Sequence, residues 1–378
     1  MRVLLYLYYP FYDKHLAGGV QVSVRKLVDK LLTKYPDIKL SIVCPHSDLH
    51  NFPENIPLHP ILHDLEQNGL NPIDLYNDLL ILEQMADDSD VIWLVDRRFP
   101  VRTAKPKLLS MNTFCYEREL KAFFESEWDR VVFNSEYLKN QLINCTTKRE
   151  DATVIPYFVD DDFRKQEKMR CSSRMSRYFE FEFDKKYILY PHRPEAEKGH
   201  LEAILILEEL IRYDSKYCLL IPMPPNSRNA DVFSENDFIQ GLKQIIAVKG
   251  LEENVVFHNW IDYSDLPYYY SMGEYSLFLS KLPETFGFVL INSISCGTPT
   301  ISYGVGALTE VVPPGRGHLV VPVGDYHSIT KLILAGEGQD EVVHDTDMVI
   351  EKYSLDRVAT QYYQLFVALG RTTVNQLV

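Results

Sequence analysis

The sequence predicts an α/β fold with two domains built on parallel sheets. Short apolar runs, typical of buried parallel strands, alternate along the chain with longer segments of helical periodicity. The alternation starts again near Tyr187, after a charged stretch at 165–186. A chain of 378 residues is long enough for two domains of ordinary size. We expect one domain at 1–164, a second at 165–354, and a closing segment at 355–378 that packs back on the first.

The elements expected in the first half follow from hydrophobic spacing and helix-boundary residues. Strands are predicted at 3–8, 40–44, 91–95, 107–111, 131–133 and 153–156. Helices are predicted at 20–34, 74–85 and 136–142. Either Asn134 or Ser135 is expected to cap the last of these helices. Residues 47–72 are rich in Pro, Asn and His, and they are predicted to form an irregular loop.

The second half is predicted to repeat this architecture, although no sequence repeat is visible. Strands are predicted at 187–190, 217–221, 255–258, 275–280 and 300–303. Helices are predicted at 201–211, within 233–249, at 266–272, after Gly287 and at 355–369.

Composition excludes several classes of protein. A formal net charge of −14 argues against nucleic acid as a partner, since binding to phosphate backbones needs clustered Lys and Arg. The sequence shows no apolar run long enough to cross a bilayer and no amphipathic basic helix, so membrane association is not expected. The six cysteines are scattered without a C-x-x-C pair, which fits a reduced, cytoplasmic setting. Without H-E-x-x-H or D-x-D motifs, no metal site is expected.

The segment 281–297 combines a loop with the start of a helix. It follows a predicted strand, so it should lie at the carboxyl edge of the sheet, where such sheets bind ligands. Gly287 allows close approach of the backbone, and the N–H groups of Phe288 and Val289 would point toward an anion such as phosphate. Glu284 could accept hydrogen bonds from hydroxyls. The segment therefore predicts a pocket for a ligand with both phosphate and hydroxyl groups.

Arg193 and Lys198 lie in the first loop of the second half, also at the end of a strand. Two cations in this position could hold a diphosphate and stabilise charge that develops on it. The alternative is that they pair with Glu195 and Glu197 at the surface.

Other candidate residues have weaker signals, each with a structural alternative. Glu310 follows a glycine-rich loop and could face a nucleotide, or it could simply stabilise a helix start. Asn292 could point into a cleft, or outward as a mild helix destabiliser.

Gly18 and Gly19 could approach a phosphate or sugar, or form a tight turn. Tyr9 and Tyr12 could stack on an acceptor's sugar rings, or complete an aromatic core.

Taken together, the motifs resemble those of the family 4 retaining glycosyltransferases of the GT-B fold. The resemblance covers nearly the whole chain and is strongest from 187 to 325. It is carried by the glycine pair at 18–19 and by the segments 154–163, 192–199, 255–270, 283–302 and 304–325. It implies two Rossmann-like domains that face each other across a cleft, with the acceptor bound mainly by the first domain and the donor mainly by the second.

The resemblance also implies roles for individual residues. Arg193 and Lys198 would hold the diphosphate of a nucleoside diphosphate sugar, with a UDP-sugar favoured, and Glu284 would bind the sugar hydroxyls. Backbone N–H groups from Phe286 to Val289 would hold sugar and phosphate. Such enzymes are metal-independent and retain the anomeric configuration. With the acidic net charge, a soluble acceptor is expected over a membrane lipid.

Three positions depart from the family pattern. Asn292 replaces a second glutamate that holds the nucleotide ribose, so altered affinity is expected. Asn112, a candidate for acceptor binding, stands where the family often has histidine, so contact with the 6-hydroxyl of the donor sugar should differ. His192 replaces a glycine and would narrow the pocket. Two other functions stay open: a sugar-nucleotide 2-epimerase of the same fold, or a degenerate binding subunit that needs a catalytic partner.

Overall fold

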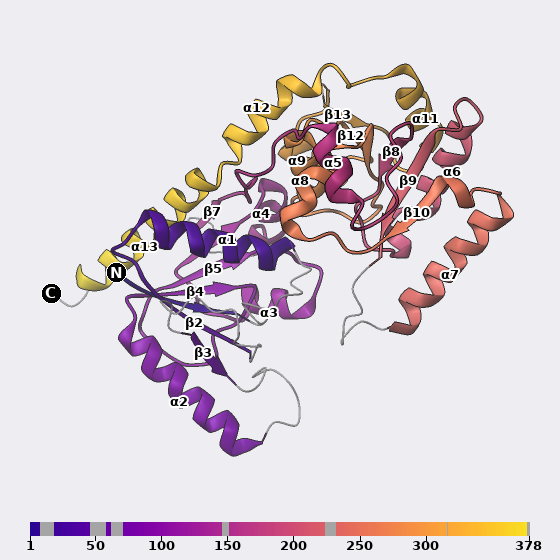
Figure 1. Ribbon diagram of the computed structural model, residues 1–378. Helices are drawn as coiled ribbons and strands as arrows, with labels where there is room; N and C mark the ends of the chain where they lie inside the picture. Colours follow the sequence, from indigo (N-terminus) through magenta and orange to yellow (C-terminus); the bar gives the residue numbers. More distant parts are fainter. Residues whose placement is uncertain are drawn as a thin grey trace. The chain divides into compact units, whose positions relative to one another are not determined.

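The computed structural model describes residues 1–7, 19–45, 58–61, 71–145, 151–223, 232–315 and 317–375. Tyr9, Tyr12 and Gly18 lie outside these residues. The chain forms two compact units: Met1–Phe158 with Leu355–Val378, and Val159–Ser354 (Figure 1). It therefore leaves the first unit six residues before the boundary expected from the sequence and returns to it at Leu355.

Within the described residues, the sheet of the first unit has seven strands in the order β3-β2-β1-β4-β5-β6-β7. All neighbouring strands are parallel. The strands are β1 (Arg2–Tyr6), β2 (Lys39–Pro45), β3 (Leu58–Ile61), β4 (Val91–Val95), β5 (Lys107–Met111), β6 (Arg130–Phe133) and β7 (Ala152–Val154). The order from β3 to β6 is that of a dinucleotide-binding doubly wound sheet.

Strand β3 corrects the expectation of an irregular loop over 47–72. It contains Pro60, which lacks a backbone N–H and argues against a strand in the sequence. The strand lies at the edge of the sheet, beside β2. An edge strand bonds on one side only, so it tolerates proline.

Helices cover both faces of this sheet. They are α1 (Gly19–Lys34), α2 (Pro72–Asp88), α3 (Glu117–Phe124), α4 (Glu136–Ile143) and α13 (Leu355–Asn375). Val3 and Leu5 of β1 pack in the cluster that contains α1 and α13, whereas Leu4 and Tyr6 pack in the cluster of α2, α3 and α4. Because both faces are covered, the strands are mostly apolar, and the central strand β4 (VIWLV) is apolar along its whole length.

The cap of α4 settles one alternative left by the sequence. The Ser135 hydroxyl accepts a hydrogen bond from the Leu138 N–H at 3.1 Å. Ser135, and not Asn134, is therefore the N-cap residue.

The second unit repeats the topology. Among the residues described, its sheet has the order β10-β9-β8-β11-β12-β13, again with parallel neighbours. The strands are β8 (Lys186–Leu189), β9 (Tyr217–Pro222), β10 (Val255–His258), β11 (Tyr275–Phe278), β12 (Thr300–Ser302) and β13 (His318–Val320). The helices are α5 (Lys168–Met175), α6 (His200–Ile211), α7 (Val232–Val248), α8 (Leu266–Ser271), α9 (Phe288–Ser295), α10 (Leu308–Val311), α11 (Tyr326–Ala335) and α12 (Val342–Lys352). The predicted α/β fold with two parallel-sheet domains is confirmed.

The strand order changes direction between β8 and β11 in the second unit, and between β1 and β4 in the first. At such a switch point the loops after the two central strands diverge, and ligands bind in the crevice outside their carboxyl ends. The fold therefore indicates two edges where a ligand could bind, one on each unit.

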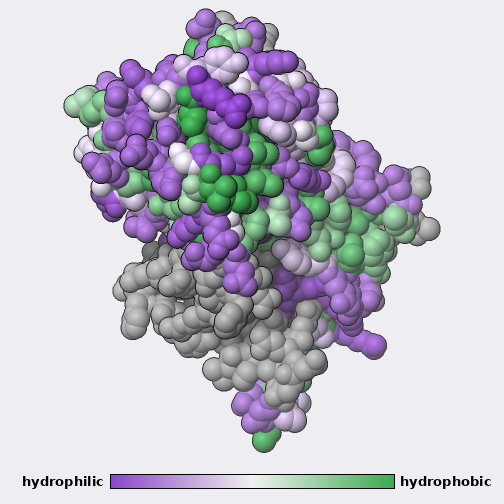
Figure 2. Space-filling view, turned by 90° about the vertical axis from the view of Figure 1, so that its right-hand side faces the viewer, coloured by the Kyte–Doolittle hydropathy of each residue, from purple (hydrophilic) through white to green (hydrophobic). Residues whose placement is uncertain are grey.

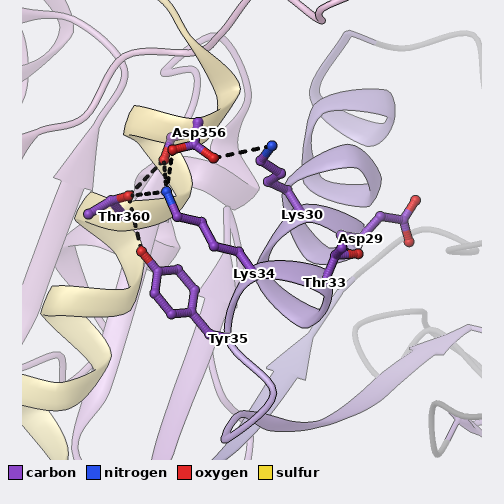
Figure 3. Close-up of polar contacts among 7 residues, drawn as sticks. All are labelled: Asp29, Lys30, Thr33, Lys34, Tyr35, Asp356 and Thr360. Atoms are coloured by element: carbon purple, nitrogen blue, oxygen red, sulfur yellow. Dashed lines mark hydrogen bonds and ion pairs between the residues drawn. The ribbon is translucent and has the colours of Figure 1, made fainter.

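Helix α13 closes the first unit by packing against α1 (Figure 3). Its first-turn residue Asp356 accepts hydrogen bonds and ion pairs from Lys34 and from Lys30, the latter at 3.2 Å. One turn later, Thr360 is bonded to Lys34 and Tyr35, both at 3.0 Å. These contacts fix the start of α13 on α1.

Hydrophilic residues cover most of the described surface on the face shown in Figure 2, interrupted by smaller hydrophobic areas. Hydrophobic residues in such numbers at the surface are ordinary for folded chains. Of the helices that lie in the described ranges, none is long and apolar enough to span a bilayer.

Candidate functional site

The strongest candidate site lies at the carboxyl edge of the second sheet, at its switch point. The loops that follow β8, β11 and β12 meet there. Lys281 N–H donates to the Glu197 carbonyl at 3.0 Å, which joins the first two loops. Ala307 N–H donates to the Glu284 carbonyl at 2.8 Å, which joins the second and third. Residues that are far apart in sequence therefore share one edge.

Lys198 and Glu284 are in direct contact. The Lys198 ammonium donates to Glu284 Oε1 at 2.7 Å, with side chains 24% and 22% exposed. Each side chain keeps solvent-accessible surface and is held by an opposite charge. A ligand phosphate could approach the ammonium and a ligand hydroxyl the carboxylate, because each side chain keeps accessible surface and charged groups form strong hydrogen bonds.

Arg193 lies on the same loop as Lys198, in a more open position. Its side chain is 55% exposed, and its Nε lies 3.6 Å from Glu195 Oε1. The surface pairing considered as an alternative is therefore present for Arg193, whereas Lys198 pairs with Glu284 and not with Glu197. A solvent-exposed pair of this kind contributes little stability, so Arg193 can change partner at low cost.

Helix α9 begins directly after Gly287 and directs its positive end toward this edge. Gly287 has a φ of 102°, a backbone conformation that residues with a side chain rarely adopt, and a Cβ there would lie 2.4 Å from Leu308 Cδ2, so a larger residue would be strained at this position. The Phe286 side chain is buried and contacts Phe288 and Tyr353 edge-on, at centroid distances of 5.5 and 5.6 Å. The aromatic ring therefore anchors the loop, and the backbone remains to meet an anion at the helix start.

The glycine-rich loop after β12 lies directly on Glu284. A Cβ on Gly306 would lie 2.2 Å from the Glu284 carbonyl oxygen, and Gly306 has a φ of 64°. Only glycine permits this contact. The loop therefore supports the backbone of Glu284, a relation that the sequence did not predict.

Two other predicted donor-site residues differ in accessibility. Asn292, in the second turn of α9, is buried, so its side chain does not extend into open solvent. Glu310 is exposed in the first turn of α10, where an acid is favoured by the helix dipole.

His192 is buried below the Arg193 loop. Its ring packs edge-on against Phe278 at 4.5 Å, and its Nε2 lies 3.2 Å from the Leu277 carbonyl. Burial lowers the pKa of His192 well below its ordinary value, so it is neutral. Its ring therefore packs against β11.

The carboxyl edge of the first sheet carries a buried polar network around Asn112, which follows β5. The Asn112 side chain donates to Asp96 Oδ2 at 2.7 Å and accepts from the Tyr157 hydroxyl at 2.5 Å. Its carbonyl accepts from Asn134 at 2.9 Å. An adjacent cavity of about 20 Å³ has room for one water but not for a sugar. Gly19, the remaining candidate of this unit, is the first residue of α1.

Asp96 was not predicted from the sequence, although a charged residue directly after the apolar run 91–95 was an available signal. Within the described ranges, no group of three or more His, Cys, Asp and Glu side chains is arranged to hold a metal ion.

Comparison with known proteins matches the second unit to a described family. Residues 175–345, which contain every candidate of the second unit, match the family described as glycosyl transferases group 1. An uncharacterised 41.2 kDa protein of the cps region of Klebsiella pneumoniae is 30% identical over 227 residues, which is 59% of this chain and 57% of that protein. N-acetyl-alpha-D-glucosaminyl L-malate synthase of Bacillus anthracis is 27% identical over 111 residues, 28% of this chain and 29% of that enzyme. The chain thus covers less than two thirds of either relative.

Solved structures match over almost the whole chain. Sucrose-phosphate synthase of Thermosynechococcus elongatus has a TM-score of 0.77 at 17% identity, covering 98% of this chain and 99% of that chain. HepE of Anabaena, in complex with UDP and glucose, has a TM-score of 0.74 at 15% identity, covering 97% and 100%. At these identities the likeness concerns the fold. The chain therefore has the GT-B fold, and its residues 175–345 match glycosyl transferases group 1.

Proposed function

We propose that the chain transfers a sugar from a nucleoside diphosphate sugar to a hydroxyl of a soluble acceptor, with retention of anomeric configuration and without a metal ion. A UDP-sugar is the favoured donor. The observation that carries the proposal is the Lys198–Glu284 pair, which lies beside the start of α9 at the switch point of the second sheet. A cation, a carboxylate and a helix N-terminus at one edge suit a ligand with phosphate and hydroxyl groups.

The comparisons support this assignment. The match to glycosyl transferases group 1 covers the loops that carry the pair. HepE was solved with UDP and glucose, and the Bacillus anthracis relative is named for an N-acetylglucosaminyl product. Each concerns another protein, and together they favour a sugar nucleotide as the ligand of this edge.

In the proposed reaction, the bond between the anomeric carbon and the diphosphate breaks, and its electrons move to the phosphate oxygen. Arg193 and Lys198 stabilise the charge on the leaving diphosphate. Glu284 holds the sugar hydroxyls while the acceptor hydroxyl oxygen attacks the anomeric carbon of the oxocarbenium-like sugar from the same face, and the proton of that hydroxyl passes to the leaving diphosphate. Cations placed where charge develops can each supply roughly 3–4 kcal/mol.

Binding of the donor requires the Lys198–Glu284 pair to exchange partners. The Lys198 ammonium turns from Glu284 to the phosphate, and the Glu284 carboxylate turns from Lys198 to the sugar hydroxyls. Each group therefore exchanges its present charged partner for a partner on the donor. Asn292 is proposed to contact the nucleotide ribose. Asn112, which is buried and bonded to Asp96 and Tyr157, is proposed to support the acceptor side of the first unit without touching a sugar itself.

Donor turnover is the direct test. The protein is incubated with UDP-, GDP-, ADP- and dTDP-sugars, and released sugar, epimerised donor and free nucleotide are measured. A transferase slowly releases free sugar, a 2-epimerase converts the donor without releasing it, and a binding subunit leaves all donors intact. The proposal requires sugar release from at least one donor.

Arg193→Ala assigns the role of the exposed cation. Its kcat should fall by roughly 10²–10³, as on removal of one preorganised donor of hydrogen bonds. Arg212→Ala is the control, because Arg212 is also an exposed arginine of this unit, paired with Glu208 at 3.4 Å. Full turnover of Arg193→Ala would exclude the role given to Arg193.

A further inference from the structure

A buried serine–histidine pair lies behind the glycine-rich loop that supports Glu284. Ser302 ends β12 and His318 begins β13, the neighbouring strand. Ser302 Oγ lies 2.7 Å from His318 Nε2, and both side chains are fully buried. Since no solvent reaches the hydroxyl, Ser302 is not placed to act as a nucleophile. The mechanism proposed above gives the pair no role.

The hydrogen-bond directions in this pair are determined by its neighbours. His318 Nδ1 lies 2.6 Å from the Val312 carbonyl, which can only accept, so Nδ1 carries the hydrogen. Burial lowers the pKa of His318 to about 4, so the ring is neutral at pH 7 and Nε2 is an acceptor. The Ser302 hydroxyl therefore donates to Nε2.

The serine oxygen also accepts a hydrogen bond, and this bond leads to the loop. Gly304 N–H donates to Ser302 Oγ at 3.0 Å. Two residues further on, Gly306 contacts the backbone of Glu284, and Ala307 N–H donates to its carbonyl. A continuous series of contacts thus runs from the buried histidine to the backbone of Glu284.

We propose that Ser302 and His318 are positioning residues of the donor site, which hold the glycine-rich loop against Glu284. His318 orients the Ser302 hydroxyl, the serine oxygen fixes the Gly304 N–H, and the loop sets the position of the Glu284 backbone. The consequence for turnover rests on the proposed function, whereas the restraint on the loop does not.

The cost of burying these groups supports a specific role. A hydroxyl and an imidazole taken out of water are costly unless each finds partners, and two apolar side chains would fill the space between the strands more cheaply. Here the Ser302 oxygen accepts a hydrogen bond from the Gly304 N–H of the loop, and the His318 ring donates one to the Val312 carbonyl. Val312 directly follows α10. The pair therefore ties both ends of the segment that carries the glycine-rich loop and α10.

Ser302→Ala tests the restraint, with Ser295→Ala as the matched control. Ser295 is equally buried, and its hydroxyl donates to the Ile291 carbonyl at 2.7 Å, away from the loop. Amide hydrogen exchange of the peptide covering 303–311 is measured in both variants and in the wild type. We expect exchange about tenfold faster in Ser302→Ala, the equivalent of one lost hydrogen bond, and no change in the control. Equal exchange in the two variants would overturn the proposal.

Ser302→Thr retains the hydroxyl and guards against general loss of folding. It should keep exchange in 303–311 near the wild-type rate even if the added methyl group lowers stability, and fast exchange in this variant would also overturn the proposal. Kinetics separate the two claims: with an active enzyme, Ser302→Ala should raise the donor KM about tenfold, and Ser295→Ala should not. A wild type without donor binding would refute the proposed function, while hydrogen exchange would still decide whether the pair restrains the loop.

Discussion

Among single residues, Asp96 combines backbone strain with buried charge. It follows β4 at the switch point of the first sheet, and its φ is 51°. A left-handed backbone costs a residue other than glycine roughly 1–3 kcal/mol, so surrounding contacts must hold it. Both carboxylate oxygens accept hydrogen bonds from Asn112, at 2.7 Å each. Burial raises the pKa of Asp96 to about 7, which makes this edge sensitive to pH.

Asp96→Asn should change the pH dependence of stability. Because the folded-state pKa lies above the ordinary value of an aspartate, the stability that Asp96 contributes is complete below about pH 4 and is lost as the pH rises to about 7. The asparagine of the variant does not titrate. The free energy of unfolding of the wild type, relative to that of the variant, should therefore fall by about 1.4 kcal/mol per pH unit over this range. Urea unfolding at several pH values measures this change.

Asp88→Asn, at the exposed end of α2, is the control for the loss of one carboxylate. If the difference in free energy of unfolding between the wild type and Asp96→Asn stays constant with pH, the pKa of Asp96 is not raised.

The candidate site shows which residue-scale features a sequence can predict. Loop motifs located Arg193, Lys198 and Glu284, and the structure places all three at one sheet edge. The Lys198–Glu284 contact spans 86 residues, so it depends on how two loops meet and no local pattern encodes it. The same holds for Ser302 and His318, which face each other only because β12 and β13 pair.

Among the elements, α13 deserves a test because one aspartate joins it to α1. The hydrogen bond from Lys34 lowers the pKa of Asp356, and Lys30 adds a second cation. The carboxylate also lies in the first turn of α13, where it stabilises the helix dipole. The aromatic rings of Tyr35 and Tyr363 stack nearby, with centroids 3.8 Å apart.

Asp356→Asn should loosen the start of α13 without unfolding the chain. The side chain is 53% exposed, so solvent screens the pair and the loss should be about 0.5–1 kcal/mol. Hydrogen exchange should rise in the first turn of α13, and the effect should diminish in high salt. Glu117→Gln, which breaks an exposed pair within α3, should leave exchange in α13 unchanged. An unchanged α13 in Asp356→Asn would show that the Thr360 hydrogen bonds and apolar packing hold this helix without the aspartate.

At this scale hydrophobic spacing gave the boundaries of the predicted elements within a few residues, because buried strands and amphipathic helices have distinct periods, but α3, α11, α12 and β13 were not predicted. The helix predicted at 20–34 is observed as α1, and the strand predicted at 255–258 is β10. Strand β3 was missed because Pro60 argues locally against a strand, and only the position of β3 at the sheet edge makes proline acceptable.

For the whole molecule, the two units repeat one strand order but differ in their buried titratable groups. The second unit buries four histidines within its described residues: His192, His200, His258 and His318. Burial lowers the pKa of each, to about 4 for the last three. The neutral ring is favoured in the folded state, so this stability is complete above about pH 6.5 and is lost as the pH falls toward 4.

The second unit should therefore be sensitive to acid, and His258 offers a simple test. Its ring lies beside Phe179 and Tyr269, and its Nδ1 lies 2.8 Å from the Asn259 carbonyl. Between about pH 6.5 and 4, the free energy of unfolding should fall less steeply with decreasing pH in His258→Gln than in the wild type, by up to about 1.4 kcal/mol per pH unit. Urea unfolding measures the slope, and His327→Gln, which removes an exposed histidine, is the control. An unaltered slope in His258→Gln would show that the pKa of His258 is not lowered in the folded state.

The carboxyl edge of the second sheet is proposed to bind the diphosphate of a sugar nucleotide. Calorimetric titration with UDP, GDP, ADP and dTDP of the wild type, Lys198→Ala and Lys249→Ala tests it most directly. The two lysines are closely matched: Lys249 pairs with Glu208 at 2.7 Å with both side chains 26% exposed, away from the edge, and Lys198 pairs with Glu284 at the same distance. We predict that Lys198→Ala weakens binding of the preferred nucleotide about 10–100-fold, the loss of one charged hydrogen bond, while Lys249→Ala binds as the wild type does. Equal affinity in the two variants, or no binding of any nucleotide by the wild type, would contradict the claim.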